Sequence, residues 1–448
     1  MFFGRTIFQK PPFISDNRRE RQFGSGFPLR KGEKSGIIEA EEEREAENLK
    51  IAGIIAEYDP FHNGHAYQIA KTKAAGVDAV VVALGGSFTQ RGEPAWCSKE
   101  LRTKAALLGG ADLVLEIPQP FAVGTAERFA VGGVSVLDAL GCVAVLSFGS
   151  ECGNANLVRR FSDFMTEEAF FEAVREELEK GVSMPVAREK AIEKLAPEFL
   201  PLTQNPNDRL AAEYLKILKK RGSEMEPFAV LRYGAGHNEE AVLKSGVASA
   251  SYLRGFTNPE EIFPYIPKRE QDLLFRAWQE GKLPADEHRY ETLVLTLLRT
   301  LPEEAFRKAP GGLEEGFYHR VFDAAKKARS LSELYERIKT KRYPMTRVRR
   351  TVAGTVLGLD EEFLSAAEVP YIHVLGMNET GAAVLAEAKG KASLPVSASL
   401  AELAKTPAGE KFAAWESRAE DLWQLLVPKP EGCGTAFTRK LVVSERNG

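Results

Sequence analysis

The segment "IAGIIAEYDPFHNGHAYQIAK", residues 51–71, indicates how the rest of the chain folds. Its first eight residues form an apolar run that can be buried on both faces, as in a parallel sheet covered by helices on both sides. Pro60 then blocks strand pairing and presets a turn, and the Asn63-Gly64 pair allows a close approach of the backbone to a ligand. The segment therefore predicts a strand, a ligand-binding turn and a helix, in that order.

Two of the six histidines of the chain, His62 and His65, lie in this turn. If a helix begins here, both lie on one of its faces, one turn apart. A helix N-terminus attracts anions through its free N–H groups and its dipole. Two imidazoles beside it can donate to phosphate oxygens and stabilise charge that develops on a phosphoryl centre. The alternative is that one histidine caps the helix and the other is a satisfied core residue.

The pattern of an apolar run followed by a helical stretch recurs along the chain. Strands that alternate with helices predict a Rossmann-like, doubly wound α/β domain with a parallel five-stranded sheet over residues 51–257. Each run ends in Gly, Pro, Asn or Ser, at the carboxyl end where such sheets bind ligands. The later runs are "DAVVVALGG" (78–86), "ADLVLEIP" (111–118), "GCVAVLSFGSE" (141–151) and "EPFAVLRYGAG" (226–236).

Beyond residue 257 the strand signal fades. Several long stretches have helical period, and only "YIHVLGMNETG", residues 371–381, is typical of a further strand with a turn. We therefore predict a mostly α-helical C-terminal domain over residues 258–448. Residues 1–50 are rich in Arg, Gly and Pro and then turn acidic, and we expect them to be a poorly ordered extension.

Composition limits the class of protein. The chain has 448 residues and a net charge of −3, so any nucleic-acid footprint has to be local. No apolar stretch approaches the roughly 18 residues that span a bilayer, and the first 50 residues lack the apolar core of a secretory signal. No Cys/His cluster has the spacing of metal ligands. We expect a cytoplasmic protein with no resident metal site, no membrane association and no implied protein partner.

A second motif, "ASASYLRG" (248–255), follows the last predicted strand. Ser249 and Ser251 can cap a helix and hold phosphate, and Arg254 can pair with phosphate in a bidentate way. Helix capping alone would explain this motif if it stood by itself. Together with HxGH after the first strand, it resembles the signatures of the nucleotidyltransferase and class I aminoacyl-tRNA synthetase superfamily. That superfamily attacks the α-phosphate of a nucleoside triphosphate, and pyrophosphate leaves.

Longer motifs make the resemblance more specific. They are "GIIAEYDPFHNGHAYQI", "GGSFTQRGEPAWCSKELRTKAALLGGADLVLEIP", "AERFAVGGVSVLDALG", "FGSE", "NPNDRLAAEYL" and "ASASYLR". In this order, from about residue 51 onward, the chain resembles the bacterial tRNA(Met) cytidine acetate ligase family. The resemblance implies an enzyme that uses ATP to activate acetate as acetyl-adenylate. The acetyl group then passes to the exocyclic amine of the wobble cytidine of elongator tRNA(Met), giving N-acetylcytidine and releasing AMP.

The resemblance also implies a set of site residues. His62, His65 and Arg254 are the expected catalytic residues, because they can offset charge in the phosphoryl transition state. The turn itself is expected to surround the nucleotide. The expected ATP-binding residues are Ile55, Ala56, Glu57, Tyr58, Asp59, Pro60, Phe61, His62, Asn63, Gly64, His65, Ala66, Tyr67, Gln68, Gly149, Asn207, Arg232, Ser249, Ser251 and Arg254.

Three of these residues belong to later strands and their turns. Gly149 ends the fourth predicted strand, where a glycine lets a nucleoside approach the backbone. Arg232 ends the fifth, and a charged residue that closes an apolar strand is awkward unless it faces a cleft. Asn207 precedes a predicted helix and could simply cap it, whereas the resemblance implies an ATP contact. All three are expected at the carboxyl edge of the sheet.

Two further stretches are candidates for substrate contacts. The loop "SFTQRGEPAWCSKELR" (87–102) follows the second predicted strand, and we expect it to bind acetate, phosphate or the target cytidine. The stretch "RIKTKRYPMTRVRR" (337–350) is basic without any acid, which suits tRNA phosphates, and its tyrosine could stack. For both stretches a solvated charged surface is the alternative. The expected tRNA-binding residues are Lys339, Lys341, Arg342, Arg347, Arg349 and Arg350.

The expected co-substrate is ATP, assisted by Mg²⁺, with free acetate as donor because no acetyl-CoA site is recognisable. The expected partners are therefore ATP, acetate and elongator tRNA(Met). Two other functions remain open. A small-molecule nucleotidyltransferase, for adenylyl or cytidylyl transfer, would have the same two motifs but would leave the helical domain and the basic stretch unexplained. A non-catalytic RNA-binding relative would leave the intact motifs unexplained.

Overall fold

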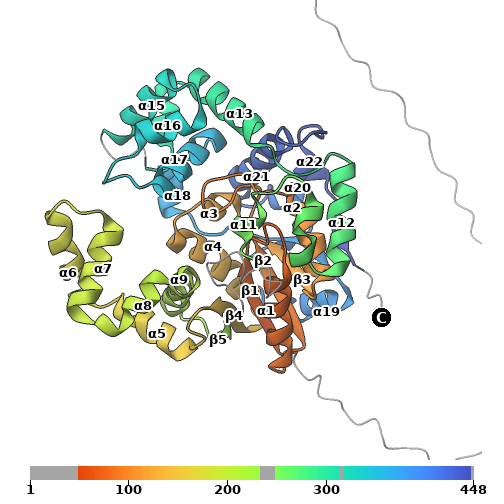
Figure 1. The fold of residues 1–448 in the computed structure, drawn as a ribbon. Helices are drawn as coiled ribbons and strands as arrows, with labels where there is room; N and C mark the ends of the chain where they lie inside the picture. The colour runs from red at the N-terminus through yellow and green to blue at the C-terminus, as the bar shows by residue number, and fades with distance from the viewer. Residues whose placement is uncertain (1–48, 233–247, 312–315, 445–448) are drawn as a thin grey trace, which may run out of the picture. The chain divides into compact units, whose positions relative to one another are not determined.

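The computed structural model describes residues 49–232, 248–311 and 316–444 (Figure 1). The expected extension over residues 1–50 falls almost entirely outside these ranges and stays a prediction. From Asn48 onward the chain forms one compact unit, and the division at residue 257 likewise stays a prediction. Within the described ranges, no helix is both long and apolar enough to cross a membrane.

Five strands form the parallel part of the sheet, and they are the five that the sequence predicts. They lie in the order β5-β4-β1-β2-β3, and every neighbouring pair is parallel. Such pairing needs helical crossovers, so the predicted α/β class is confirmed. The strands are β1 (Ile51–Ala56), β2 (Ala79–Leu84), β3 (Leu113–Glu116), β4 (Val143–Ser150) and β5 (Glu226–Leu231).

The sheet is wider than the predicted five strands. β6 (Ile372–Met377) pairs antiparallel with β3, and it is the strand that the "YIHVLGMNETG" run predicts. β7 (Val396–Ser397) and β8 (Val442–Val443) both pair with β6 in parallel. The C-terminal part of the chain therefore completes the sheet, a pairing across about 260 residues that local sequence periodicity does not report.

Side chains of the central strands alternate between two apolar cores, one on each face of the sheet. Ile51 and Ile55 of β1 belong to the larger core, which also contains Phe129. Ala52 and Ile54 belong to the smaller core, together with Ile69. The alternation follows from the two-residue period of a strand, and burial on both faces explains why these strands are apolar throughout.

Helices that follow the strands supply both cores. α1 (Asn63–Ala74) and α2 (Lys99–Leu108) contribute Ile69 and Ala105 to the smaller core, whereas α4 (Ala126–Ala139) contributes to the larger one. A Cβ at Gly133 would lie 2.7 Å from Cγ2 of Ile55, so the glycine lets α4 pack closely on β1. The other helices before β5 are α3 (Gln119–Ala122), α5 (Ala155–Phe164), α6 (Glu168–Glu179), α7 (Met184–Leu195), α8 (Leu200–Gln204) and α9 (Pro206–Arg221).

The chain after β5 is mostly helical, as predicted. Side chains of Asp286 and Ser330 cap α13 and α16, each accepting from a backbone N–H three residues on. The helices are α11 (Ala250–Leu253), α12 (Lys268–Gln279), α13 (Glu287–Thr300), α14 (Glu303–Lys308), α15 (Phe317–Lys327), α16 (Leu331–Ile338), α17 (Met345–Leu357), α18 (Glu361–Ala366), α19 (Glu379–Ala388), α20 (Leu400–Leu403), α21 (Gly409–Gln424) and α22 (Thr435–Thr438).

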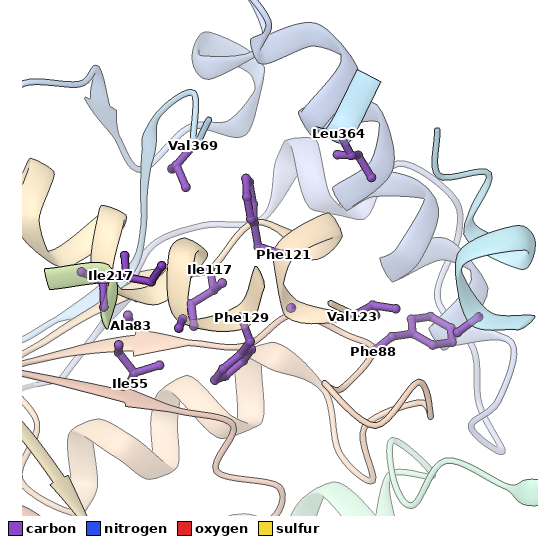
Figure 2. Close-up of a cluster of buried hydrophobic side chains, with 14 of the residues drawn as sticks. Ile55, Ala83, Phe88, Ile117, Phe121, Val123, Phe129, Ile217, Leu364 and Val369 are labelled. Atoms are coloured by element: carbon purple, nitrogen blue, oxygen red, sulfur yellow. The ribbon is translucent and has the colours of Figure 1, made fainter. Parts of the chain in front are cut away.

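The larger core joins the sheet to this helical part. Figure 2 shows Ile55 of β1 and Ala83 of β2 near Phe129 of α4, with Phe121 and Leu364 beyond them. The ring of Phe121 stacks on that of Phe412 in α21, with centroids 5.9 Å apart. Helices from the end of the chain therefore pack on elements that follow β3, and they hold the carboxyl edge of the sheet in place.

Candidate functional site

The turn after β1 places both histidines in the first turn of α1. His62 is the N-cap, and its Nδ1 accepts a hydrogen bond from the N–H of Gly64 at 3.1 Å. Nδ1 of His65 accepts in return from the N–H of His62 at 3.3 Å. The pair forms a capping box, a role more often filled by Ser or Thr with Glu or Gln. The histidines lie together as predicted, and they also cap the helix.

These hydrogen bonds determine which ring nitrogen carries the proton. Because both Nδ1 atoms accept, each neutral ring carries its hydrogen on Nε2. The two rings are stacked, with centroids 3.7 Å apart and planes inclined by 20°. Each ring can therefore donate from Nε2 to an anion at the N-terminus of α1, where the helix dipole also favours negative charge.

Burial keeps both imidazoles neutral near pH 7. His62 is 4% exposed, and burial together with the Arg232 guanidinium lowers its pKa to about 3. Burial also lowers the pKa of His65 well below its usual value, and repulsion from a protonated His62 and from the Arg232 guanidinium adds to the effect. A bound anion would oppose these effects, because an opposite charge favours the imidazolium form. The site is thus prepared for a negatively charged ligand.

A pocket lies beside the histidines at the carboxyl ends of β4 and β5. Gly149 is the seventh residue of β4, and Arg232 directly follows β5. A Cβ at Gly149 would lie 3.7 Å from Cγ of Arg232, so the two residues are neighbours in this wall. Val230 and Leu231 also line it, and the sequence analysis did not name them. The lining residues are His62, Gly64, His65, Tyr67, Gln68, Gly149, Val230, Leu231 and Arg232.

Asn207 lies behind this wall and does not cap a helix. Asn205 is the N-cap of α9, and Asn207 is inside the first turn. Its Nδ2 donates to Glu151 Oε1 at 2.5 Å, and Arg232 Nε lies 3.9 Å from the same oxygen. Glu151 therefore joins Asn207 to Arg232. The sequence analysis missed Glu151, although its place directly after β4 is a signal that could have found it.

The two acids of the turn face a neighbouring loop. Glu57 Oε1 accepts from the N–H of Gln90 at 2.6 Å. Asp59, 1% exposed, accepts at Oδ1 from the N–H groups of Trp96 and Cys97, at 2.8 and 3.3 Å. Burial raises the pKa of Glu57. Both carboxylates thus hold residues 87–98, hereafter the β2 loop, and the expected role of these two residues in ATP binding stays a prediction.

The remaining expected residues of the turn fall into two groups. Ile55, Tyr58 and Phe61 are buried in the apolar cores on the two faces of the sheet, so only their backbone can face a ligand. Tyr58 has a φ of +49°, a left-handed conformation that turns the chain sharply after β1. The others are less buried: Ala56, Asn63, Ala66 and Gln68 are half-buried or partly exposed, and Asn63 donates to Pro264 O at 3.3 Å.

The second motif lies against the first through Arg254. Ser249 is the N-cap of α11, as predicted, and accepts from the N–H of Tyr252. Arg254 Nη1 donates to the carbonyl oxygen of Asp59 at 3.0 Å, and its Nη2 donates to Ser251 Oγ at 3.3 Å. The same hydroxyl accepts from Arg91 of the β2 loop at 2.7 Å. The two motifs and the β2 loop are therefore linked by hydrogen bonds.

Two charged residues expected in a ligand-binding loop are buried structural residues. Arg102, 1% exposed, donates to four carbonyl oxygens, those of Glu57, Gly85, Gly86 and Cys97, at 2.6–3.3 Å. Lys99, 3% exposed, forms an ion pair with Glu116. Arg102 thereby ties the carboxyl end of β1 to that of β2. The sequence analysis grouped both residues with the loop because charged residues are usually exposed.

The basic stretch is only partly available to a ligand. Arg349 of α17 pairs with Glu93 of the β2 loop at 2.5 Å, and Lys339 pairs with Glu336 at 3.3 Å. Tyr343 is buried, with its ring 4.3 Å from that of Phe317, so stacking on a base was a wrong expectation for it. Lys341 and Arg342 are exposed, and Arg347 and Arg350 are half-buried. The role of these side chains in tRNA binding stays a prediction.

The other histidines and possible metal ligands add little to this site. His237 lies outside the described residues. His373 is buried against Glu116, with Nδ1 2.5 Å from Oε2, on the far side of β3. Among the residues that the structure describes, no three His, Cys, Asp or Glu side chains are gathered as metal ligands.

Comparison with known proteins places the chain in a family. A family model described as HIGH Nucleotidyl Transferase matches residues 49–435. The tRNA(Met) cytidine acetate ligase of Acetivibrio thermocellus is 34% identical over 416 residues, which cover 88% of this chain and all of that protein. The protein of the same name from Thermoanaerobacter sp. (strain X514) is 34% identical over 404 residues, with the same coverage.

Solved structures agree with this. A crystal structure of Thermotoga maritima TmcAL bound with alpha-thio ATP superposes with a TM-score of 0.80 at 28% identity, covering 88% of this chain and all of that one. The apo structure of the same protein gives the same values. From the matched length, the shared fold and the histidine turn after β1, we conclude that the chain belongs to the HIGH nucleotidyltransferases and, within them, to the tRNA(Met) cytidine acetate ligase family.

Proposed function

We propose that the chain is an ATP-dependent ligase that acetylates the wobble cytidine of elongator tRNA(Met) in the cytoplasm. The observation that carries this is the pair of stacked, neutral imidazoles that cap α1 in a pocket with Arg232 and Gly149. A helix N-terminus, two Nε2–H donors and a guanidinium form a site for a phosphate chain. The relatives named tRNA(Met) cytidine acetate ligase supply the reaction and the RNA substrate.

In the first step, an acetate oxygen attacks the α-phosphorus of ATP, a P–O bond forms, and the bond to pyrophosphate breaks. Charge grows on the phosphoryl oxygens as this happens. We infer that the Nε2–H groups of His62 and His65, the dipole of α1 and the Arg232 guanidinium offset that charge. Arg254, linked to the same turn through Asp59, is a further candidate. Direct removal of one donor of this kind costs roughly 10²–10³ in rate in a comparable oxyanion site.

Magnesium would be bound mainly through the nucleotide. Mg²⁺ in nucleotide sites is held by substrate phosphates with one or two protein carboxylates. Glu151, 3.9 Å from Arg232 of the pocket wall, is a candidate for such a carboxylate, and the ion would offset the charge of the triphosphate.

In the second step, the exocyclic amine of cytidine attacks the acetyl carbonyl carbon of the mixed anhydride. A C–N bond forms, the C–O bond to AMP breaks, AMP leaves with the electron pair, and the amine loses a proton. The proposal requires no covalent intermediate on the protein. Lys341 and Arg342, exposed at the end of the basic stretch, are candidates to hold the tRNA backbone, because phosphates supply most of the affinity for nucleic acids.

The test is exchange of pyrophosphate into ATP, with and without acetate, in the native protein and in His65→Ala. We expect acetate-dependent exchange that falls at least about 100-fold in the variant, since it loses one Nε2–H donor and half of the capping box. His319→Ala is the matched control, because His319 is exposed and contacts only Glu303, at 3.4 Å, and the neighbouring ring of Tyr318 in the contacts that the structure gives for the described residues. Acetylated cytidine after addition of tRNA(Met) identifies the acceptor.

A small-molecule nucleotidyltransferase is the second candidate. The histidine turn and the pocket suited to phosphate favour this function as much as the ligase, because both reactions begin with attack on an α-phosphate. Exchange that ignores acetate, or no acetylation with tRNA(Met) present, would refute the ligase proposal and favour this alternative.

A further inference from the structure

A second cavity lies beside Arg254, the arginine of the second motif. It has a volume of about 420 Å³, and it lies between the β2 loop and helices α13, α16 and α17. Arg254, which donates to Asp59 O three residues before His62, forms one of its walls. The lining residues are Glu93, Pro94, Trp96, Arg254, Ala285, Glu287, His288, Tyr290, Glu291, Leu331, Ser332, Tyr335, Glu336, Met345 and Arg349.

Three aromatic side chains give the cavity flat, rigid surfaces. Trp96, Tyr290 and Tyr335 are 5%, 3% and 7% exposed. Trp96 is held at both ends, because its backbone N–H donates to Asp59 and its indole N–H donates to Phe256 O. Enzymes that act on a nucleobase commonly hold the unstacked base between aromatic or apolar side chains. The volume lies within the usual range for small-ligand pockets, roughly 300–1,000 Å³.

The charges of the lining favour a neutral ligand with hydrogen-bond donors. Four carboxylates face two guanidiniums, and a phosphate would meet this excess of negative charge unfavourably. Glu93 and Arg349 are paired at 2.5 Å, and Arg349 Nε is buried with no hydrogen-bond partner among the described residues. The pair therefore offers an acceptor beside a donor. Cytosine carries the complementary groups on its Watson–Crick edge, a donor amine at N4 beside acceptors at N3 and O2.

We propose that this cavity binds the acceptor base itself, a cytosine turned out of the RNA, with its N4 amine hydrogen-bonded to Glu93. The assignment rests on the proposed ligase function and names the subsite for its second substrate. It gives Arg349 a different role from backbone binding, because the side chain faces the base edge. Uridine fits worse, since its O4 would place an acceptor against the Glu93 carboxylate.

The experiment blocks the cavity without touching the nucleotide site. Ser332 lies on α16 at the cavity wall and is exposed, so Ser332→Trp fills the space and removes no hydrogen bond given by the structure. Thr296→Trp is the matched control, since Thr296 is exposed on α13 but outside this cavity. Two readouts are compared in full-length protein: acetyl transfer to tRNA(Met), and acetyl transfer to hydroxylamine, a small amine that needs no base pocket.

We expect Ser332→Trp to lower transfer to tRNA at least about tenfold while acetyl hydroxamate formation stays native, and Thr296→Trp to change neither. Glu93→Gln is the second variant. Because a bidentate base contact is worth roughly five- to 100-fold in discrimination, it should lower transfer to tRNA. It should also narrow the difference in affinity between tRNA with cytidine at the wobble position and tRNA with uridine there, measured by binding because uridine has no amine to acetylate. Native transfer to tRNA in both variants would overturn the proposal. If the native protein forms no hydroxamate from acetate and ATP and does not acetylate tRNA, the ligase function fails, and this assignment fails with it.

Discussion

Glu270 is a buried acid, and its ionisation should lower the stability of the folded protein. It is the third residue of α12, its side chain is 1% exposed, and neither carboxylate oxygen has a hydrogen-bond partner among the described residues. Burial raises its pKa from 4.5 to about 7. Leu274 of the same helix belongs to the apolar cluster that contains Trp96 and Leu253. The positive charge of Arg269 offsets only part of the effect of burial on the pKa of Glu270.

The sign of the effect follows from proton binding. Between pH 4.5 and 7 the folded chain keeps a proton on Glu270 that the unfolded chain has released, so stability falls as pH rises through this window. Above pH 7 the carboxyl is ionised in both the folded and the unfolded chain, so the folded protein bears the full free-energy cost of the buried charge. Since each pKa unit corresponds to 1.36 kcal/mol, the difference between 4.5 and about 7 amounts to about 3 kcal/mol. Glu270→Gln removes the charge and should therefore stabilise the protein by up to about 3 kcal/mol at pH 8.

The assay is urea unfolding at pH 5 and pH 8, with the free energy of unfolding extrapolated to water. At pH 5 the gain from Glu270→Gln should shrink below about 1 kcal/mol, because the native carboxyl is then mostly protonated. Glu172→Gln, an exposed position on α6, is the control and should show no such pH dependence. A stabilisation by Glu270→Gln that is equal at both pH values, or no stabilisation at pH 8, would refute the reasoning.

Three further predictions concern the nucleotide site and the β2 loop. Gly92→Ala should lower the free energy of unfolding, measured in urea, by more than the roughly 1–3 kcal/mol that a strained backbone costs by itself. The φ of Gly92 is +78°, and a Cβ there would also lie 2.5 Å from the backbone N of Arg350. Gly76→Ala, where φ is +81° and the space is open, should show only the cost of backbone strain. Asp59→Asn should change the KM for ATP less than about threefold, since its Oδ1 acceptor role is kept; a larger change in steady-state kinetics would mean that the carboxylate faces the nucleotide. Because the folded protein favours the neutral form of His62, the free energy of unfolding should fall as pH drops from 6.5 toward 3, by about 2 kcal/mol at pH 5. A decline that is equally steep in His62→Gln would contradict this.

Local sequence signals were sufficient for the parallel strands and for the first motif. The five strands are apolar runs whose side chains are buried on both faces, so period and composition report them directly. The histidine turn could be predicted because Pro60 fixes the backbone and blocks strand pairing, whereas the Asn63-Gly64 pair permits a tight turn. That both imidazoles would cap α1 through Nδ1 depends on the angle at which the helix leaves the turn, which residue types alone do not determine.

Longer-range contacts explain what the sequence analysis missed. Lys99 looks like a loop lysine, but Glu116, Glu416 and Glu420 surround it in the buried interior, and two of these acids come from α21. β6 has a visible strand pattern, yet its partner β3 lies in a different part of the chain. Glu416 and Glu420 lie more than 300 residues from Lys99, and β6 lies about 260 residues from β3. Helical and strand periodicity carry no information over such separations.

The β2 loop explains why the two acids within the first motif are compatible with a phosphate site. Glu57 and Asp59 accept from backbone N–H groups of that loop, so their charge is directed away from the pocket. The loop in turn donates through Arg91 to Ser251 and pairs through Glu93 with Arg349. Because one hydrogen-bonded segment contacts both motifs and forms a wall of the second cavity, the nucleotide site and the proposed base site share a support. A substitution that displaces the loop should therefore impair both half-reactions, whereas one that only fills the cavity should impair the second alone.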